Sequence, residues 1–220
     1  MPPVSDPHSG QSVLRSGPSP KDARLVAILL HGRGASAEDI LGLAHQFSAR
    51  NIAYVAPQAA DSAWYPYSFL APIAQNEPSL GSALQVVAGL AEDLAHQGIP
   101  AERLVVMGFS QGACLTLEFA ARHARRYAAV VAFTGGLIGP PGTPRDYSGD
   151  FAGTPVFIGS SDVDPHVPLE RVQESATVFR RMGATVDERI YPRMGHTINA
   201  DELRAVDTLL AGEGGRHDGA

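Results

Sequence analysis

The sequence predicts an α/β fold with a mostly parallel central sheet and helices on both faces of the sheet. Short, continuously apolar segments recur along the chain, and segments with helical periodicity lie between them. Strands of a parallel sheet are buried on both faces, so they are continuous apolar runs instead of alternating apolar and polar residues. The alternation of strands and helices favours the same fold, because a parallel connection must cross over the sheet, usually as a helix.

Each predicted strand is such an apolar segment. The first covers residues 25–30, where the run stands between Arg24 and His31. The later strands cover residues 52–56, 104–107, 128–133, 155–158 and, with a more polar sequence, 184–191. These lengths are typical of strands and too short for membrane spans.

Helices are predicted between these strands from residues that favour helix ends. Serine is a preferred N-cap, proline is favoured in the first turn, and glycine is favoured just after the last turn. Gly98 and Gly183 supply two such stops. The predicted helices run from the cap Ser36 to about residue 50, from Ser79 or Ser82 to Gln97, and from Pro168 to Met182.

The chain of 220 residues and 23.2 kDa has the length of one domain, which we place at residues 21–211. Residues 1–20 are rich in proline, serine and glycine and are predicted as an N-terminal arm. Within this arm, residues 11–15 can form an edge strand. Residues 212–220 are predicted as a flexible tail.

The composition excludes several classes of protein. With 17 Lys and Arg against 23 Asp and Glu, the net charge is −6, and the chain lacks the basic footprint of a nucleic-acid binder. The single cysteine, Cys114, rules out an internal disulfide framework and a four-cysteine metal site. No apolar run approaches the roughly 18 residues of a membrane span, and the first residues lack the apolar core of a signal peptide. We therefore expect no stable membrane insertion and a cytoplasmic location.

The residues Gly108-Phe109-Ser110-Gln111-Gly112 match the G-x-S-x-G motif of a nucleophile elbow. In such an elbow the serine lies on a sharp turn between a strand and a helix, and its neighbours two positions away must be small. The context agrees, because an apolar strand precedes the motif and a helical run at residues 113–121 follows it. Ser110 is therefore the predicted nucleophile, and the alternative is a plain strand-to-helix turn.

A serine nucleophile needs a base that accepts its proton and an acid that orients the base. Among the histidines after Ser110, His123 lies on the helix that Ser110 begins and cannot reach back to the hydroxyl. His166 lies only two residues from an acid candidate. His196 follows the last predicted strand on a loop that contains a glycine, so it is the predicted base.

Two carboxylates, Asp162 and Asp164, follow the predicted strand 155–158 and are candidates for the acid. Open parallel sheets place their ligands at the carboxyl ends of the strands. Either aspartate can instead cap the following turn. With Ser110 and His196, the resulting order of serine, aspartate and histidine is the order of the α/β-hydrolase arrangement. The predicted fold is therefore the α/β-hydrolase fold.

The negative charge that develops on a substrate carbonyl oxygen needs two fixed donors, usually backbone N–H groups. The N–H of Gln111 is one candidate, because it opens a helix, where N–H groups lack an intrahelical acceptor. A second is expected from the loop 30–34, whose glycines allow the backbone to approach a substrate. A nucleotide-binding loop is disfavoured, since Ala37 stands where the third glycine of that fingerprint is required.

Three motifs together resemble the phospholipase/carboxylesterase family of small α/β-hydrolases, which includes bacterial carboxylesterases and acyl-protein thioesterases. They are residues 29–36 (LLHGRGAS), 108–113 (GFSQGA) and 162–168 (DVDPHVP), and the resemblance covers about residues 25–210. In that family the second aspartate of a D-x-D-P segment is the triad acid, so the resemblance implies this role for Asp164. It also implies backbone oxyanion donors at Arg33 and Gln111 and the base at His196.

The chain departs from the family at two places. Arg33 stands where many members have an apolar residue, and Thr197-Ile198-Asn199 replaces a serine-rich segment. The segment 64–78 resembles the bacterial carboxylesterase branch more than the depalmitoylating one. These differences concern the substrate and not the chemistry.

Two predicted loops, residues 57–78 and 135–153, are long for a compact domain, and such loops are usually functional or disordered. The first is rich in aromatic residues, and we predict Trp64, Tyr65 and Phe69 as substrate-binding residues that form an apolar wall. Ordinary core packing is an equal alternative for these side chains. The second loop offers little apolar surface, so the acyl site should be modest in size.

His31 and Cys114 have simpler explanations than a part in the chemistry. His31, His166 and His196 lack the acidic ligand spacing of a metal site, so a neutral His31 that binds loop backbone is favoured. Dienelactone hydrolases carry a cysteine at the elbow, but here serine holds that position, and Cys114 is expected to pack in the interior. No metal and no cofactor are expected.

The sequence predicts a metal-independent serine hydrolase that cleaves carboxylic esters with short to medium acyl or small aromatic groups through an acyl-enzyme. An acyl-protein or small-molecule thioesterase is the alternative. A non-catalytic ligand-binding protein of the same fold is disfavoured by the complete set of Ser110, Asp164 and His196. The expected partner is a small-molecule ester, and the sequence is compatible with a homodimer.

Overall fold

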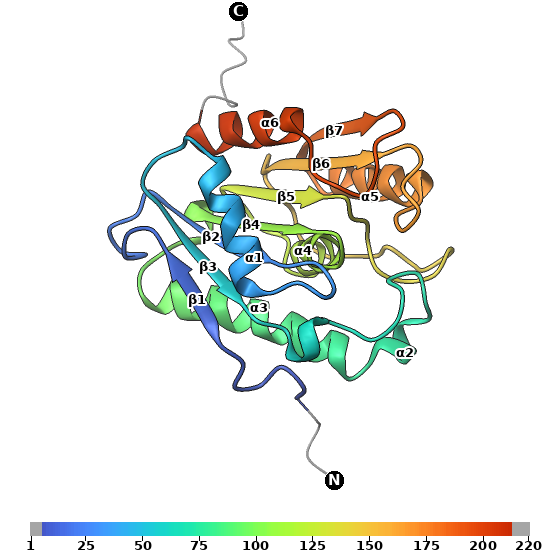
Figure 1. Cartoon of the computed structure of the whole chain (residues 1–220), viewed down its shortest axis with the longest axis horizontal. Helices are drawn as coiled ribbons and strands as arrows, with labels where there is room; N and C mark the ends of the chain where they lie inside the picture. The colour runs from blue at the N-terminus through green and yellow to red at the C-terminus, as the bar shows by residue number, and fades with distance from the viewer. Residues whose placement is uncertain (1–5, 213–220) are drawn as a thin grey trace, which may run out of the picture.

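A seven-stranded sheet forms the centre of the computed structural model, which describes residues 6–212 (Figure 1). The strand order is β1-β3-β2-β4-β5-β6-β7, and only β1 runs antiparallel to its neighbour. The predicted, mostly parallel sheet is therefore confirmed. The strands are β1 (Val13–Ser16), β2 (Leu25–Leu30), β3 (Ile52–Pro57), β4 (Leu104–Phe109), β5 (Ala129–Phe133), β6 (Pro155–Ser161) and β7 (Thr185–Tyr191).

Six of these strands lie where the sequence predicted them, five from apolar runs and β7 from a more polar segment, but β4 and β6 extend further than their runs. Pairing continues through Gly108, which lies opposite Leu30, and through Gly159, which lies opposite Phe133. The apolar pattern ends at these glycines, whereas the backbone hydrogen bonds do not. Both strands therefore extend further at their carboxyl ends than the apolar runs indicate.

The edge strand β1 lies within the first residues of the chain and pairs with β3. The residues before it also pack on the domain, because His8 is buried and its ring contacts the carbonyl oxygen of Trp64 and the N–H of Ala60. From His8 onward, these residues form part of the packed structure. Apart from Gly212, the predicted tail lies outside the described residues.

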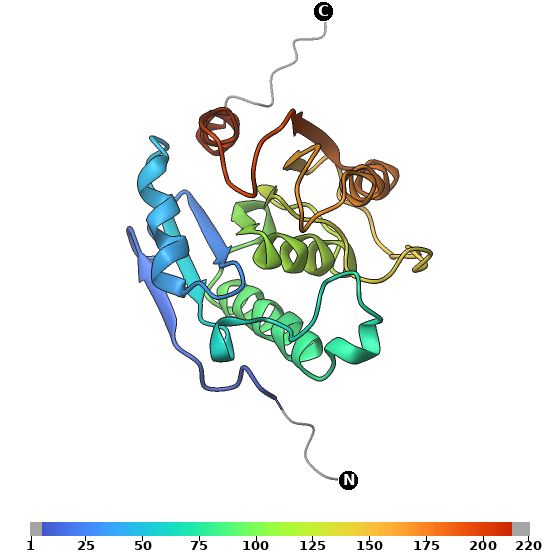
Figure 2. The same cartoon turned by 45° about the vertical axis from the view of Figure 1, so that its right-hand side comes forward.

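Helices cover both faces of the sheet, as Figures 1 and 2 show. Within β2, Val26 and Ile28 belong to the core beneath α3, α4 and α5, whereas Ala27 and Leu29 belong to the core beneath α1 and α6. This alternation explains why each central strand is apolar throughout. The helices are α1 (Ala37–Leu41), α2 (Ile73–Asn76), α3 (Ser79–His96), α4 (Gln111–Arg122), α5 (Leu169–Arg181) and α6 (Ala200–Ala211), with short 3-10 turns at Gly42–Gln46, Ala60–Ser62 and Ala101–Arg103.

The first helix is shorter than predicted. Ser36 caps it as expected, in a reciprocal capping box with Asp39, but α1 ends at Leu41 and a 3-10 turn follows. The N–H groups of Ser48 and Ala49, which a helix to residue 50 would use, donate instead to Asp207 of α6 at 2.8 and 2.9 Å. A contact distant in sequence therefore competes with the local helical pattern.

The parallel strands bring separate segments together at their carboxyl ends. Ser110 follows β4, Asp164 follows β6 and His196 follows β7, so all three lie beyond the carboxyl ends of strands. The two long loops approach each other there, since the N–H of Gly139 donates to the carbonyl of Phe69 at 2.7 Å. Among residues 6–212, no helix combines the length and the apolar character needed to cross a membrane.

Candidate active site

Ser110 lies on a strained turn between β4 and α4. Its backbone has φ 55° and ψ −118°, a conformation that L-residues rarely adopt. A Cβ on Gly108 would lie 2.5 Å from the backbone of Gly112, and a Cβ on Gly112 would lie 2.0 Å from the carbonyl oxygen of Leu30. Both glycines are therefore required by close packing, which matches the steric demand of the predicted elbow.

His196 connects Ser110 to Asp164 through two short hydrogen bonds. Its Nε2 lies 2.8 Å from the Ser110 hydroxyl, and its Nδ1 lies 2.7 Å from a carboxylate oxygen of Asp164. A carboxylate accepts the Nδ1–H, which leaves Nε2 free to accept the hydroxyl proton. The geometry is that of a nucleophile, a base and an orienting acid.

Asp164 is held by the protein on both carboxylate oxygens. The oxygen that does not face His196 accepts the N–H groups of His166 and Val167 at 2.8 and 2.9 Å, and the side chain is fully buried. Burial alone would raise the pKa of this carboxyl, but the hydrogen bonds from His196 and the two N–H groups outweigh it. The pKa of Asp164 therefore lies below its ordinary value, so the group is a carboxylate at neutral pH.

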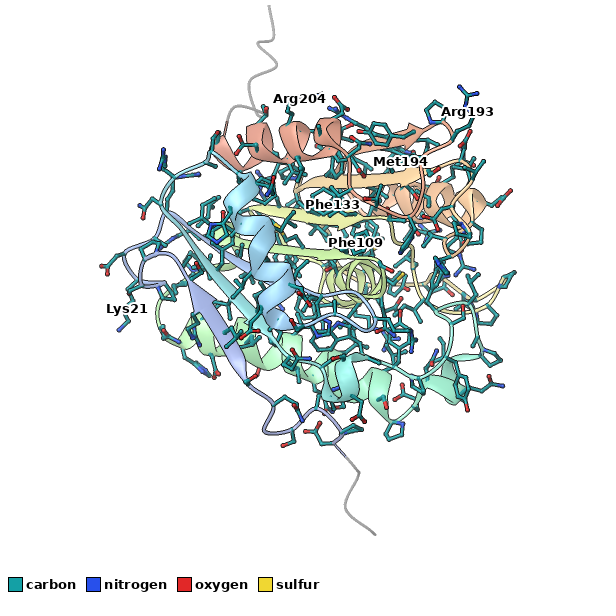
Figure 3. All side chains as sticks on the ribbon, in the orientation of Figure 1. Lys21, Phe109, Phe133, Arg193, Met194 and Arg204 are labelled. Atoms are coloured by element: carbon teal, nitrogen blue, oxygen red, sulfur yellow. The ribbon has the colours of Figure 1, made fainter. Side chains whose placement is uncertain are left out.

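Asp162 makes a different contact. Its carboxylate accepts the N–H of Arg193 at 2.7 Å, on the loop that carries His196 from β7 to α6. Arg193 has a positive φ of 56°, and Asn199 at the end of the same loop caps α6. Figure 3 shows Arg193 and Met194 on this loop, with Phe109 near the end of β4. The two aspartates are therefore distinguished by contact: Asp164 binds the histidine ring and Asp162 binds the histidine loop.

Two aromatic rings lie against His196. The ring of Phe109 lies 5.2 Å from it, and the ring of His166 lies 4.8 Å away in an edge-on arrangement, both measured between ring centroids. His166 contacts Asp164 through its backbone N–H and lines the cavity in front of Ser110. The sequence placed His166 near the acid but gave no indication that its ring meets the cavity.

His31 and His123 lie apart from this cluster. The Nε2 of His31 accepts the N–H of Ala59 at 3.1 Å, so its Nδ1 carries the hydrogen that is donated to the Gly32 carbonyl at 2.8 Å. Burial lowers the pKa of His31, which agrees with a neutral ring. His123 stacks on Phe119 at the far end of α4.

The backbone N–H groups of Arg33 and Gln111 are free to bind a substrate oxygen. Gln111 is the first residue of α4, and neither N–H has an acceptor within residues 6–212. The loop that carries Arg33 passes close to the nucleophile, since a Cβ on Gly32 would lie 3.5 Å from the Cβ of Ser110. Both predicted donors therefore lie on segments that flank Ser110.

The side chains of these two residues hold the aromatic segment 64–67. Gln111 accepts the N–H of Trp64 at 2.9 Å and donates to the carbonyl of Tyr65 at 2.8 Å. The Arg33 guanidinium donates to the carbonyls of Tyr65, Pro66 and Tyr67 at 2.8 to 3.0 Å. Sequence reasoning did not find these contacts, because they join three segments that are distant along the chain.

A cavity of about 540 Å³ opens in front of Ser110 and His196. Of the three aromatic residues predicted to bind substrate, Tyr65 and Phe69 line it. Trp64 does not, and this prediction is corrected: its side chain is fully buried, lies against the His31 ring, and donates from Nε1 to the His31 carbonyl at 2.9 Å. The lining residues are Arg33, Tyr65, Pro66, Tyr67, Ser68, Phe69, Ser110, Gln111, Cys114, His166, Val167 and His196.

Cys114, one helical turn after Ser110, also lines this cavity. Burial raises the pKa of its thiol to about 12, and the thiol form is a poor nucleophile. Within residues 6–212, no group of three or more His, Cys, Asp or Glu side chains is placed to hold a metal ion. Ser110, in contrast, has its hydroxyl 2.8 Å from Nε2 of His196 in the same cavity.

Comparison with known proteins assigns the chain to a family. The model of the family described as Phospholipase/Carboxylesterase matches residues 16–212. A solved phospholipase/carboxylesterase from Dyadobacter fermentans is 46% identical, with a TM-score of 0.88 over 91% of this chain and 96% of that one. The Bacillus cereus carboxylesterase, at 17% identity and a TM-score of 0.73, shares the fold over 92% of this chain and 94% of its own. The predicted α/β-hydrolase fold is therefore confirmed.

Two further relatives align over most of their length. A probable carboxylesterase SOBER1-like of Arabidopsis thaliana is 26% identical over 92% of this chain and 83% of that protein. Acyl-protein thioesterase 1 of Saccharomyces cerevisiae is also 26% identical, over 90% of this chain and 96% of that protein.

Proposed function

The chain belongs to the phospholipase/carboxylesterase family, and we propose that it is a serine hydrolase that cleaves carboxylic esters through an acyl-enzyme on Ser110. As a member of that family it is a carboxylesterase-type hydrolase of esters or thioesters. The observation that carries the proposed mechanism is the unbroken chain of hydrogen bonds from Ser110 through His196 to Asp164 at the cavity.

In the first half of the reaction, Ser110 attacks the ester carbonyl as His196 Nε2 takes the hydroxyl proton. Asp164 stabilises the imidazolium that forms and keeps the ring in the required orientation. The carbonyl oxygen becomes an oxyanion, which the N–H groups of Arg33 and Gln111 stabilise. His196 then donates its proton to the leaving alcohol, and the acyl group remains on Ser110.

In the second half, a water molecule takes the position that the alcohol has left. His196 accepts a proton from this water, which attacks the acyl carbonyl and passes through a second oxyanion at the same N–H groups. Collapse of that intermediate releases the carboxylic acid and returns the proton from His196 to Ser110. No metal ion takes part in this cycle.

The cavity supports a preference for short to medium acyl groups or small aromatic groups. Tyr65, Phe69 and Val167 provide apolar walls, and the cavity of about 540 Å³ has the size of a small-molecule site. The segment 64–67 is tied to Arg33 and Gln111, so this wall is held close to the nucleophile.

Thioester hydrolysis is the second candidate, and the similarity to the yeast acyl-protein thioesterase favours it. The same nucleophile and the same oxyanion donors serve both ester types, which differ in the leaving group. Matched oxygen and thiol esters with one acyl group distinguish them through the ratio of their kcat/KM values.

Labelling with a fluorophosphonate probe tests the proposed function. We expect stoichiometric labelling of the wild type on Ser110, none of the Ser110→Ala variant, and loss of ester hydrolysis in proportion to labelling. Ester hydrolysis by Ser110→Ala at the wild-type rate would contradict the proposal.

A further inference from the structure

The lining of the candidate active site carries a permanent positive charge, that of Arg33, in a protein of net charge −6. Among its lining residues, Arg33 carries a permanent positive charge and no Asp or Glu is present. The N-terminus of α4, at Ser110 and Gln111, is also part of the cavity lining, and a helix N-terminus carries a partial positive charge. The remaining lining residues are two histidines and side chains that carry no ionic charge at neutral pH.

The Arg33 side chain is held in place at this wall. Three backbone carbonyls, those of Tyr65, Pro66 and Tyr67, accept hydrogen bonds from its Nη1 and Nη2 atoms. Its guanidinium carbon also lies 5.9 Å from the centre of the Tyr65 ring. A side chain ordered in this way can bind a ligand at a lower entropic cost than a freely moving one.

The charge of Arg33 is not neutralised by these contacts. Carbonyl groups are uncharged, and within residues 6–212 no carboxylate forms an ion pair with Arg33. A guanidinium has five N–H donors, and the three carbonyls leave the Nε–H and one Nη1–H unused. An arginine with free donors beside a cavity is suited to bind a carboxylate.

We propose that Arg33 selects substrates whose acyl group ends in a carboxylate, so that half-esters of short dicarboxylic acids are preferred over neutral esters of the same shape. This inference rests on the proposed function, because it places the acyl group in the cavity between Ser110 and Arg33. The apolar walls contact the methylene groups, and the guanidinium binds the distal carboxylate. The ester and the carboxylate must then be separated by a chain of defined length.

The test compares benzyl half-esters of succinate, glutarate and adipate with the matching primary amides, in which the carboxylate is replaced by a neutral group of similar shape. Release of benzyl alcohol gives kcat/KM for each substrate at one pH. The quantity of interest is the ratio of acid to amide within each variant, because a general change in activity cancels in that ratio. The variants are Arg33→Gln, Arg33→Lys and, as a matched control, Arg50→Gln, an exposed arginine before β3 at the opposite end of the sheet.

We expect the wild-type ratio to exceed one, with a maximum at one chain length. Arg33→Gln should lower that maximum about tenfold, which corresponds to about 1.4 kcal/mol. Arg33→Lys should retain part of the preference, and Arg50→Gln should retain all of it. A wild-type ratio below one at every length, or an unchanged ratio in Arg33→Gln, would overturn the inference.

A measurement on the wild type alone gives a test that does not depend on whether the variants fold. Added salt screens an interaction between exposed charges, so the acid-to-amide ratio should fall as sodium chloride is raised. A ratio that does not respond to salt would contradict the inference. The proposed function fails separately, if the neutral amide-bearing esters are not hydrolysed through Ser110 at all.

Discussion

The reactivity of Ser110 depends on a backbone conformation that its neighbours make accessible. With φ 55° the serine would be strained in isolation, and the close packing of Gly108, Gly112 and Leu30 maintains the turn. Strain of this kind persists only where the surrounding structure enforces it, and it is concentrated at functional sites. The hydroxyl is thereby presented to His196 instead of capping α4, since the Ser110 side chain makes no capping hydrogen bond.

Replacing Ser110 or His196 by alanine should lower kcat by several orders of magnitude. The two residues act as one unit, so the double variant should be little worse than either single one. Steady-state kinetics on a p-nitrophenyl ester measures this effect, with the exposed Ser12→Ala as a matched control. Losses that add up in the double variant would show that the two residues act independently.

Substitution of the two aspartates should separate their roles. Asp164→Asn should lower kcat by about 10⁴-fold, because an amide can hold the wrong tautomer of the histidine. Asp162→Asn should have a much smaller effect, since its amide oxygen can still accept the N–H of Arg193. The comparison of kcat between the two variants decides the assignment, and a larger loss in Asp162→Asn would reverse it.

The segment between β3 and α3 contacts Arg33 and Gln111 and also lines the cavity in front of Ser110. Its backbone is bound by Arg33 and Gln111, and Trp64 is bound to the carbonyl of His31. Tyr65 and Phe69 then face the cavity from the same segment. The proposed acyl-binding wall is therefore positioned by the residues whose N–H groups are proposed to stabilise the oxyanion.

This arrangement predicts a limited tolerance for acyl length. Each buried methylene contributes at most about 0.8 kcal/mol, so kcat/KM for p-nitrophenyl esters should rise over a few carbons and then fall. Phe69→Ala enlarges the cavity and should move the optimum to a longer acyl chain. A steady rise of kcat/KM to palmitate in the wild type would contradict this account of the wall.

The elements differ in how well the sequence predicted them. A strand that is buried on both faces is marked by its own continuous run of apolar residues, so the ends of β2 are predicted correctly. The helix after Ser36 is predicted too long, because Asp207 binds N–H groups near its expected end and no local pattern reveals this. Trp64 is an apolar residue in an aromatic loop, and sequence does not determine which side chains of such a loop turn inward.

The candidate site shows the same division. The elbow and the order of serine, aspartate and histidine follow from local motifs, whereas the choice between Asp162 and Asp164 needed a family resemblance. The side-chain contacts of Arg33 and Gln111 could not be predicted at all, because they depend on how three separate segments meet. Motifs within one short segment can therefore be predicted from this sequence, whereas side-chain contacts between distant segments cannot.

The stability of the whole molecule should depend on Glu202, a buried carboxyl at the start of α6. One of its oxygens accepts the N–H of Asn199 at 2.8 Å, and the other has no partner within residues 6–212. Burial raises the pKa of Glu202 to about 7, the N–H of Asn199 opposes this shift, and the nearby Asp201 adds to it. The folded protein therefore binds a proton here more tightly than the unfolded chain does.

A raised carboxyl pKa makes the free energy of unfolding fall as pH rises between the unfolded value of about 4.5 and the folded value of about 7. The total loss is at most about 3 kcal/mol. The side chain introduced by Glu202→Gln cannot ionise. The free energy of unfolding of the wild type should therefore rise relative to that of the variant as pH falls from 8 to 5. Urea unfolding at several pH values measures this difference, and parallel curves would show that Glu202 does not titrate in this range.

The fold as a whole brings the ends of three strands together, and we propose that an acyl group is transferred to Ser110 there. The most direct test is to mix the protein with a p-nitrophenyl ester, stop the reaction in acid during turnover, and locate the added mass by peptide mapping. We predict a burst of p-nitrophenol in proportion to the protein and an acyl group on Ser110 itself, which fragment-ion sequencing of the mapped peptide distinguishes from Cys114, four residues further along the same peptide. Turnover without any acyl group on Ser110, or an acyl group on Cys114 instead, would contradict the account.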